Sequence, residues 1–230
     1  MSDSQYFERN EVWVGDVRAR DHSDLPGGVV VKFHPRSQHN VVRLAPNNSW
    51  RRLEIDLSSA VKCTVKVGAI KVQFGGVRIS FVANSGTYST NVSVSVGDGC
   101  VFNGSTHIIG PLTPGLEVRV GKDCLFASGI TIRGSSHHGL WDKESGALLN
   151  PEVGISIGDH VWIGQEVSVL NKAKIPDGSV VAAKSIVNKA FEETDVLLAG
   201  APAAIRRRGI AWTSEFPSDN GAAPRRNARR

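Results

Sequence analysis

The chain has 230 residues, which is enough for one domain with a full hydrophobic core, alone or with a small appendage. Its 40% apolar and 21% charged residues are ordinary for a globular protein, and no apolar run is long enough for a transmembrane helix. The polar segment 1–10 lacks the apolar core of a secretory signal, so a cytoplasmic location is expected. The net charge of +5 comes with arginines clustered late in the chain and without interleaved aromatic residues, so no nucleic-acid partner is expected.

The first part of the chain gives the weakest pattern. Residues 1–40 show no repeat, and we expect them to be an N-terminal cap that covers the open end of a repeat domain at 41–212. From Val61 to Ile79 apolar and polar residues alternate, as in Val65-Lys66-Val67. We interpret this alternation as coils of the repeat domain whose register has degraded.

Large apolar residues recur at every sixth position further along the chain. A period of six matches neither an α-helix nor an ordinary strand, but it is typical of a solenoid of short parallel strands with one inward side chain per segment. The fourth position after most of these residues is small or β-branched, and Cys100 and Cys124 occupy that position, which predicts that both are buried and structural. The recurring residues are Val96, Phe102, Ile108, Val120, Phe126, Ile132, Ile157, Ile163, Val169, Ile175, Val181 and Val187.

The repeat fails between Ile132 and Ile157. The stretch 134–154 is rich in Gly, Ser and His, and we predict a loop that leaves the solenoid and carries the functional site. After a turn at Pro202, the segment Ala203 to Trp212 is predicted to form a short C-terminal helix or an extension. Residues 213–230 contain four arginines among Gly, Pro, Ala and Asn, and a basic, disordered tail is expected there.

Two groups of motifs resemble a known family. The hexads Ile157-Gly-Asp-His-Val-Trp-Ile-Gly164, with the later Ala199-Gly-Ala-Pro-Ala203, resemble the hexapeptide-repeat acyltransferases. The loop Ser135-Ser-His-His-Gly-Leu-Trp-Asp142, followed by Leu149-Asn-Pro151, is similar to the O-acetyltransferases of bacterial surface polysaccharides. The resemblance implies an all-β, left-handed parallel β-helix that assembles as a homotrimer, and transfer of an acetyl group from acetyl-CoA to a sugar or polysaccharide hydroxyl.

The resemblance also implies roles for the loop histidines. Attack of an alcohol on a thioester needs a base, for which histidine is the natural choice at neutral pH. His138 matches the family's catalytic histidine, and His137 beside it is the rival. Ser136 stands where the family usually has Asp, so it can bond to an imidazole but cannot stabilise an imidazolium by charge. Trp162 stands where the family places an aromatic residue near the cleft between subunits.

Two further sets of residues follow from the resemblance. In the loop, Asp142 or Glu144 could replace the missing acid, and Asp142 and Asn150 are candidates for contact with the acceptor. Coenzyme A is expected on the last coils, with its phosphates near basic side chains, and no metal is expected. The candidate coenzyme residues are Gly164, Ala183, Lys184, Ser185, Lys189, Ala201, Pro202, Arg206 and Arg207, with Arg208 in the same basic cluster.

Two other classes of protein share features with this sequence. A γ-type carbonic anhydrase uses the same solenoid with zinc, but His107, His138 and His160 do not have the required ligand spacing. A non-catalytic scaffold is the alternative that Ser136 and Ala201, both departures from the family pattern, would favour. The retained His138 favours the enzyme over that scaffold.

Overall fold

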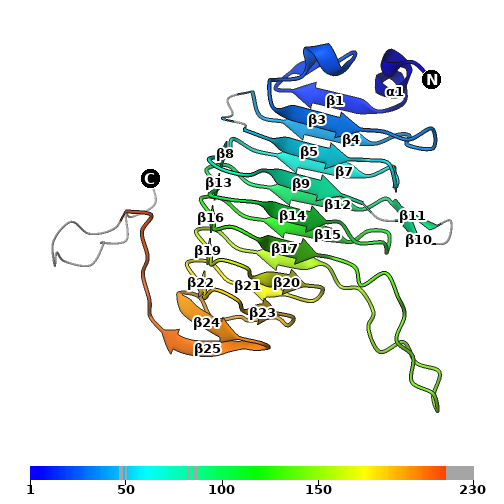
Figure 1. Ribbon diagram of the computed structural model, residues 1–230. Coiled ribbons are helices and arrows are strands. Elements are labelled where there is room, and N and C mark those ends of the chain that lie inside the picture. Colours follow the sequence, from blue (N-terminus) through cyan, green and yellow to red (C-terminus); the bar gives the residue numbers. More distant parts are fainter. Residues whose placement is uncertain (47–48, 50, 82, 85–86, 216–230) are drawn as a thin grey trace.

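The computed structural model describes residues 1–46, 49, 51–81, 83–84 and 87–215. The chain winds into a column of coils with three flat faces, and each face is a sheet of stacked, mostly parallel strands (Figure 1). The chain passes from face 1 to face 2, then to face 3, and back to face 1 one coil further along. The all-β parallel helix expected from the period of six is confirmed.

Most strands belong to one of the three faces, and the remainder are listed with the helices. Face 1 consists of β1 (Glu11–Val14), β2 (Val17–Arg18), β4 (Val41–Leu44), β7 (Thr64–Val67), β12 (Ser93–Val96), β15 (Glu117–Val120), β18 (Ile155–Ile157) and β21 (Lys174–Ile175). Face 2 consists of β8 (Lys71–Val72), β13 (Val101–Phe102), β16 (Leu125–Phe126), β19 (Trp162–Ile163), β22 (Val180–Val181), β24 (Val196–Gly200) and β25 (Ala203–Arg208). Face 3 consists of β3 (Val29–Lys32), β5 (Leu53–Asp56), β9 (Val77–Ser80), β14 (Thr106–Ile109), β17 (Ile130–Arg133), β20 (Ser168–Leu170) and β23 (Ile186–Val187). The other elements are α1 (Asp3–Arg9), the 3-10 helix η1 (His22–Asp24), β6 (Ala60–Val61), β10 (Ala83–Asn84) and β11 (Thr87–Thr90).

The predicted inward residues form the core. All twelve of the recurring apolar residues are at most 4% exposed, and they stack in register from coil to coil, as Phe102 does on Phe126 with ring centroids 4.6 Å apart. All three cysteines are reduced and buried, which confirms the burial predicted for Cys100 and Cys124. Hydrophobic burial along this stack is the main stabilising contribution, because each coil covers the apolar interior of the next.

Longer coils gain their extra residues at the corner where face 3 meets face 1, here called the 3–1 corner. Val96 and its Cα partner Val120 are 24 residues apart, whereas Ile157 and Ile175 are 18 apart. The additional residues of the longer coil lie between β14 and β15, and the β10–β11 pair and the 134–154 loop also leave at this corner (Figure 1). The functional loop is therefore one of several excursions on the same edge.

The two ends of the column differ. At the N-terminal end, α1 has a capping box made by Ser2 and Gln5, and its buried Phe7 packs edge-on against Phe33. At the other end, the helix considered for Ala203 to Trp212 is wrong, because β25 is a strand that pairs antiparallel with β24. The open edge of β24 offers unpaired backbone groups, and satisfying them outweighs the helix propensity of this Ala- and Arg-rich segment. Among the described residues, the helices are too short to cross a membrane.

Candidate active site

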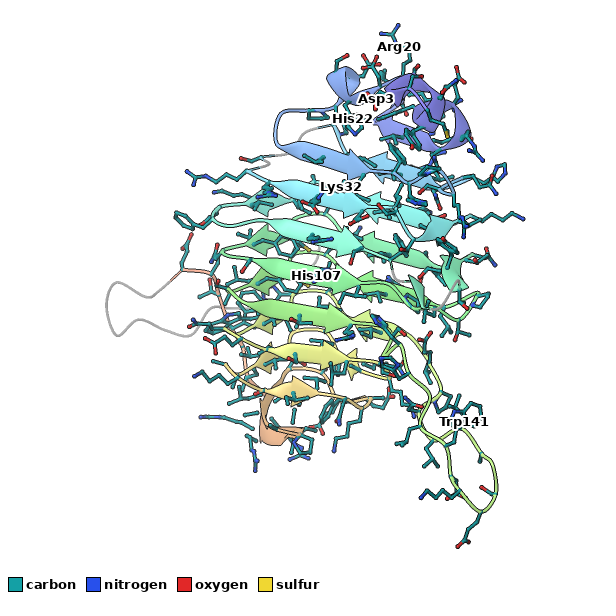
Figure 2. All side chains as sticks on the ribbon, turned by 45° about the vertical axis from the view of Figure 1, so that its right-hand side comes forward. Asp3, Arg20, His22, Lys32, His107 and Trp141 are labelled. Atoms are coloured by element: carbon teal, nitrogen blue, oxygen red, sulfur yellow. The ribbon has the colours of Figure 1, made fainter. Side chains whose placement is uncertain are left out.

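The loop between β17 and β18 projects away from the column as a hairpin (Figure 1). Trp141 and Leu148 form a bridge, and the Leu149 amide donates to the Leu140 carbonyl at 2.7 Å. Trp141 lies on the projecting part of the loop and is 60% exposed (Figure 2). The projecting part of the loop thus has its own hydrogen-bonded structure.

The base of the loop is fixed to the solenoid by two side chains. Glu152 accepts hydrogen bonds from the Leu112 and Thr113 amides at 2.9 and 2.8 Å, which joins the loop to the preceding coil at the same corner. Asn171 accepts from the Val153 amide at 2.8 Å and donates to the Pro151 carbonyl at 2.9 Å, which joins it to the following coil. Sequence reasoning missed both residues, since neither belongs to a motif.

The two loop histidines have different surroundings. Nδ1 of His137 lies 3.4 Å from a guanidinium nitrogen of Arg133, and arginine only donates, so this nitrogen is the acceptor. Burial, then the positive charge of Arg133, lowers the pKa of His137, so its neutral form is favoured. His138 is exposed, and its ring has no hydrogen-bond partner within the described part of the chain. The structure therefore leaves the His138 imidazole available to a ligand and engages that of His137.

The backbone of His138 is held by the two polar residues predicted nearby. Ser136 donates through Oγ to the His138 carbonyl at 3.2 Å, and Asn150 donates to the same carbonyl at 2.8 Å and to Ser136 Oγ at 2.9 Å. Oδ1 of Asn150 accepts from the Leu140 amide at 2.7 Å. Ser136 thus bonds to the backbone of His138 and not to its ring, and the Asn150 amide is engaged within the loop.

Asp142 lies at the start of the hairpin turn. One of its carboxylate oxygens accepts from the Ser145 amide and hydroxyl, both at 2.7 Å, and from the Glu144 amide at 3.1 Å. The hydrogen bonds from Ser145 hold the pKa of Asp142 below its ordinary value. The carboxylate therefore closes the turn, and neither Asp142 nor Glu144 contacts a loop histidine by a hydrogen bond in the described residues.

Most of the predicted coenzyme residues gather at the corner between face 2 and face 3, here called the 2–3 corner. Gly164, Ala183 and Ala201 follow successive strands of face 2 at this corner, and Ala183 and Ala201 are exposed. A Cβ on Gly164 would lie 2.7 Å from the Ala183 amide nitrogen, so only glycine allows the coils to stack so closely. Ser185 is buried and accepts from the Gly200 amide at 3.1 Å, and the Ala201–Pro202 peptide is cis.

The basic residues predicted to bind coenzyme A do not all lie at the 2–3 corner. Arg206 is at the 2–3 corner, where its Nε donates to the Ala199 carbonyl at 3.3 Å. Lys184 is also there, 3.7 Å from Glu166. Arg207 pairs with Leu197 in face 2, Arg208 forms an ion pair with Glu193, and Lys189 lies beyond β23 at the 3–1 corner.

Trp162 lies on face 2, opposite the 3–1 corner, so within one chain it does not share a site with the loop. Its ring centroid is 6.0 Å from that of Trp212, which stacks on His160 at 4.2 Å. The C-terminal segment therefore lies beside Trp162, which stays 39% exposed. Within the described residues, no group of three or more His, Cys, Asp or Glu side chains is arranged to hold a metal ion.

Comparisons with known proteins find similar O-acetyltransferases. No protein-family model matches the chain. A polysialic acid O-acetyltransferase of Escherichia coli O1:K1 is 34% identical over 126 residues, which cover 50% of this chain and 41% of that protein. The putative lipopolysaccharide biosynthesis O-acetyl transferase WbbJ of Escherichia coli K12 is 33% identical over 102 residues, which cover 40% of this chain and 50% of that protein. The matches thus span half or less of these relatives.

The solved structure of the polysialic acid O-acetyltransferase OatWY has the same fold, with a TM-score of 0.58 and 19% identity over 91% of this chain and 90% of that chain. This likeness confirms the predicted class, a left-handed parallel β-helix. Within that class, the chain resembles the hexapeptide-repeat O-acetyltransferases, as its loop and hexad motifs predicted.

Proposed function

We propose that this chain is an O-acetyltransferase that moves an acetyl group from acetyl-CoA to a hydroxyl of a sugar or polysaccharide. The observation that carries the proposal is the setting of His138, whose exposed ring has no described partner while Asn150 and Ser136 hold its backbone. A base on a fixed backbone with a free imidazole is what proton abstraction from an acceptor hydroxyl requires. The names of the similar proteins support the same reaction class.

In the proposed reaction, His138 accepts the hydroxyl proton as the acceptor oxygen attacks the thioester carbonyl. The new C–O bond forms, the C–S bond breaks, and the proton passes from the imidazolium to the departing thiolate of coenzyme A. His137 stays neutral beside Arg133 and orders the start of the loop. A backbone amide of a coil would stabilise the oxyanion.

The 2–3 corner suits an extended coenzyme arm. The corner has small side chains, because Ala183 and Ala201 are exposed there and Gly164 is tightly packed. An extended ligand can therefore lie close to the backbone. Arg206 and Lys184 at the same corner supply positive charge for phosphate groups. We therefore place the donor there, with Lys189 outside this group.

The loop and this corner lie on opposite edges of face 3, so one chain alone does not bring His138 to the proposed donor site. We propose that a homotrimer does so, with the loop of one subunit at the 2–3 corner of its neighbour. The apolar side chains exposed on the loop support this packing, because a neighbouring subunit would cover them. They are Leu140, Trp141, Leu148, Leu149 and Val153.

The proposed base is tested by His138→Ala, with His137→Gln as the matched variant. We expect His138→Ala to lower kcat at least about 100-fold, which is the usual contribution of a general base. Calorimetric titration should still show one coenzyme A bound per subunit. Retention of most of the activity in His138→Ala would refute the assignment, and absence of coenzyme A binding by the unmodified chain would refute the acetyltransferase.

The shared site is tested by mixing two inactive variants. His138→Ala lacks the base, and Ala183→Trp blocks the proposed donor corner at an exposed position. In randomly mixed trimers, about a quarter of the interfaces join an intact loop to an intact corner, so about a quarter of the activity should return. If each chain held its own complete site, mixing would restore nothing.

A further inference from the structure

One column of outward side chains on face 1 carries four basic residues, Arg43, Lys66, Arg119 and Lys174, and no acidic residue. Cα pairing places Trp13, Arg43, Lys66, Ser95, Arg119, Ser156 and Lys174 in one register across seven neighbouring strands, and this set is here called the basic ladder. The alternate residues, such as Val65 and Val118, are buried, so the ladder points outward. From β1 to β21 it extends roughly 29 Å, at about 4.8 Å per strand.

Three of the four basic side chains of the ladder are not paired with acids among the described residues. In the part of the chain that the structure describes, Arg43, Lys66 and Arg119 form no ion pair, and Arg43 stacks over Trp13 at 5.2 Å. Only Lys174 is paired, with Glu192. Arg43 and Lys66 are direct cross-strand neighbours, and like charges in such a position are destabilising.

Face 3 shows the opposite arrangement. There, Lys32 and Arg52 both pair with Glu54, and Arg78 pairs with Glu54 and Asp56. Lys32 and His107 on this face are labelled in Figure 2. Lys32, Arg52 and Arg78 are thus paired with acids, whereas three of the four cations of the basic ladder are not paired with any described acid, which favours an external anion on face 1.

We propose that the basic ladder binds an extended acidic polysaccharide. This deepens the proposed function by naming the acceptor class, and it rests on that function for the claim that the bound polymer is the acceptor. The ladder includes Ser156 of β18, the strand into which the 134–154 loop returns, so a polymer on the ladder passes the base of the loop that carries His138.

The chemistry of the ladder favours a single acidic sugar chain over a nucleic acid. Lys66, Arg119 and Lys174 are each two strands apart, about 10 Å, whereas phosphates of one strand of a DNA duplex follow about every 3.4 Å along its axis. Ser95 and Ser156 between them offer hydroxyl groups that bond to sugar hydroxyls. Only Trp13 is aromatic in the ladder, so bases would find no stacking platform.

Acidic side chains limit the bound polymer to the ladder. Along the corner between face 1 and face 2, Asp98, Asp159 and Asp177 each accept a backbone N–H of the preceding coil at 2.8 Å. Glu11 and Glu117 lie in the other outward column of face 1. These carboxylates repel a polyanion on both sides, which leaves one line of contact between them.

The test uses two double variants of the full chain with the same loss of charge. Lys66→Gln/Arg119→Gln removes two ladder charges, and Lys71→Gln/Arg51→Gln removes one Lys and one Arg from other parts of the surface. Fluorescence anisotropy at low salt measures binding of polysialic acid, polygalacturonate, neutral dextran and single-stranded DNA. We expect both acidic polysaccharides to bind in a salt-sensitive way, the ladder variant to bind about tenfold more weakly, and the control variant to bind as the unmodified chain does.

An equal loss of affinity for the acidic polysaccharides in the two variants, or no loss of affinity in the ladder variant, would overturn the proposal. Tighter binding of the DNA or equal binding of dextran would do so as well. Coenzyme A titration separates this inference from the proposed function, because the ladder variant should bind coenzyme A normally and show a raised KM only for long acidic acceptors. If the ladder variant binds acidic polysaccharides normally while coenzyme A also binds, the proposal for the basic ladder alone is overturned. If coenzyme A does not bind, the proposed acetyltransferase is overturned instead.

Discussion

The most informative single position is Asn150, because its amide joins three parts of the loop. It accepts from the Leu140 amide at 2.7 Å and donates to Ser136 Oγ at 2.9 Å and to the His138 carbonyl at 2.8 Å. A hydrogen bond contributes about 0.5–1.5 kcal/mol net, and the low end applies to these partly exposed groups, so Asn150→Ala should destabilise the closed loop by about 1.5–2 kcal/mol. Opening of the loop should then increase more than about tenfold.

Hydrogen exchange of the Leu140 amide measures this opening directly, and kcat reports the position of His138. Asn150→Asp is the matched control, since its carboxylate can still accept from Leu140 but places an oxygen against the His138 carbonyl. We expect Asn150→Ala to lose both protection and activity, and Asn150→Asp to keep the protection of Leu140 while kcat falls. Unchanged exchange and unchanged kcat in Asn150→Ala would refute the positioning role.

Two further predictions concern stability. Phe126→Ala should lower the free energy of unfolding by about 3–5 kcal/mol, because the ring is fully buried and stacks on Phe102. Denaturant titration measures this change, and a loss below about 1 kcal/mol would contradict the tight stacking of coils. Burial, then two nearby arginines, lowers the pKa of His107 from its ordinary value of 6.5, so the unfolded chain binds the extra proton first as the pH falls. Its contribution to stability is therefore complete above about pH 6.5 and is lost as the pH falls through the lowered pKa. Denaturant titrations at about pH 7.5 and about pH 5 should show a smaller loss on acidification in His107→Gln, and an equal loss would count against this setting for His107.

The core of the solenoid could be predicted because its period is set by geometry. Wherever a coil has tight corners, successive faces contribute inward residues that are six positions apart, as in the run from Ile157 to Val187. The N-terminal coils could not be placed in this way. Val67, Val72 and Ile79 occupy inward positions of successive faces, but five and seven residues separate them, so corners of unequal length shift the period.

The candidate site was less predictable than the core, for a different physical reason. The loop and its histidines stand out in the sequence because the repeat fails there. The partners of those residues depend on how the hairpin folds, and the contact of Asn150 with His138 crosses twelve positions that carry no periodic signal. Glu152 and Asn171, which fix the loop base, act on backbone groups of neighbouring coils and so leave no motif.

The division between core and loop has a consequence for the chemistry that this scaffold can carry. The inward hexad residues stabilise the column without contributing to the loop, and the loop closes through its own hydrogen bonds and two anchors. Substitutions that change the acceptor can therefore accumulate in the loop and on the outward side of face 1 at little cost to the core. Because outward residues of a strand alternate with buried ones, the charge on face 1 can also change without altering the packing beneath it. The unpaired cations of the basic ladder are thus not required by the fold, and the costly placement of Arg43 beside Lys66 is consistent with the polyanion that we propose for face 1.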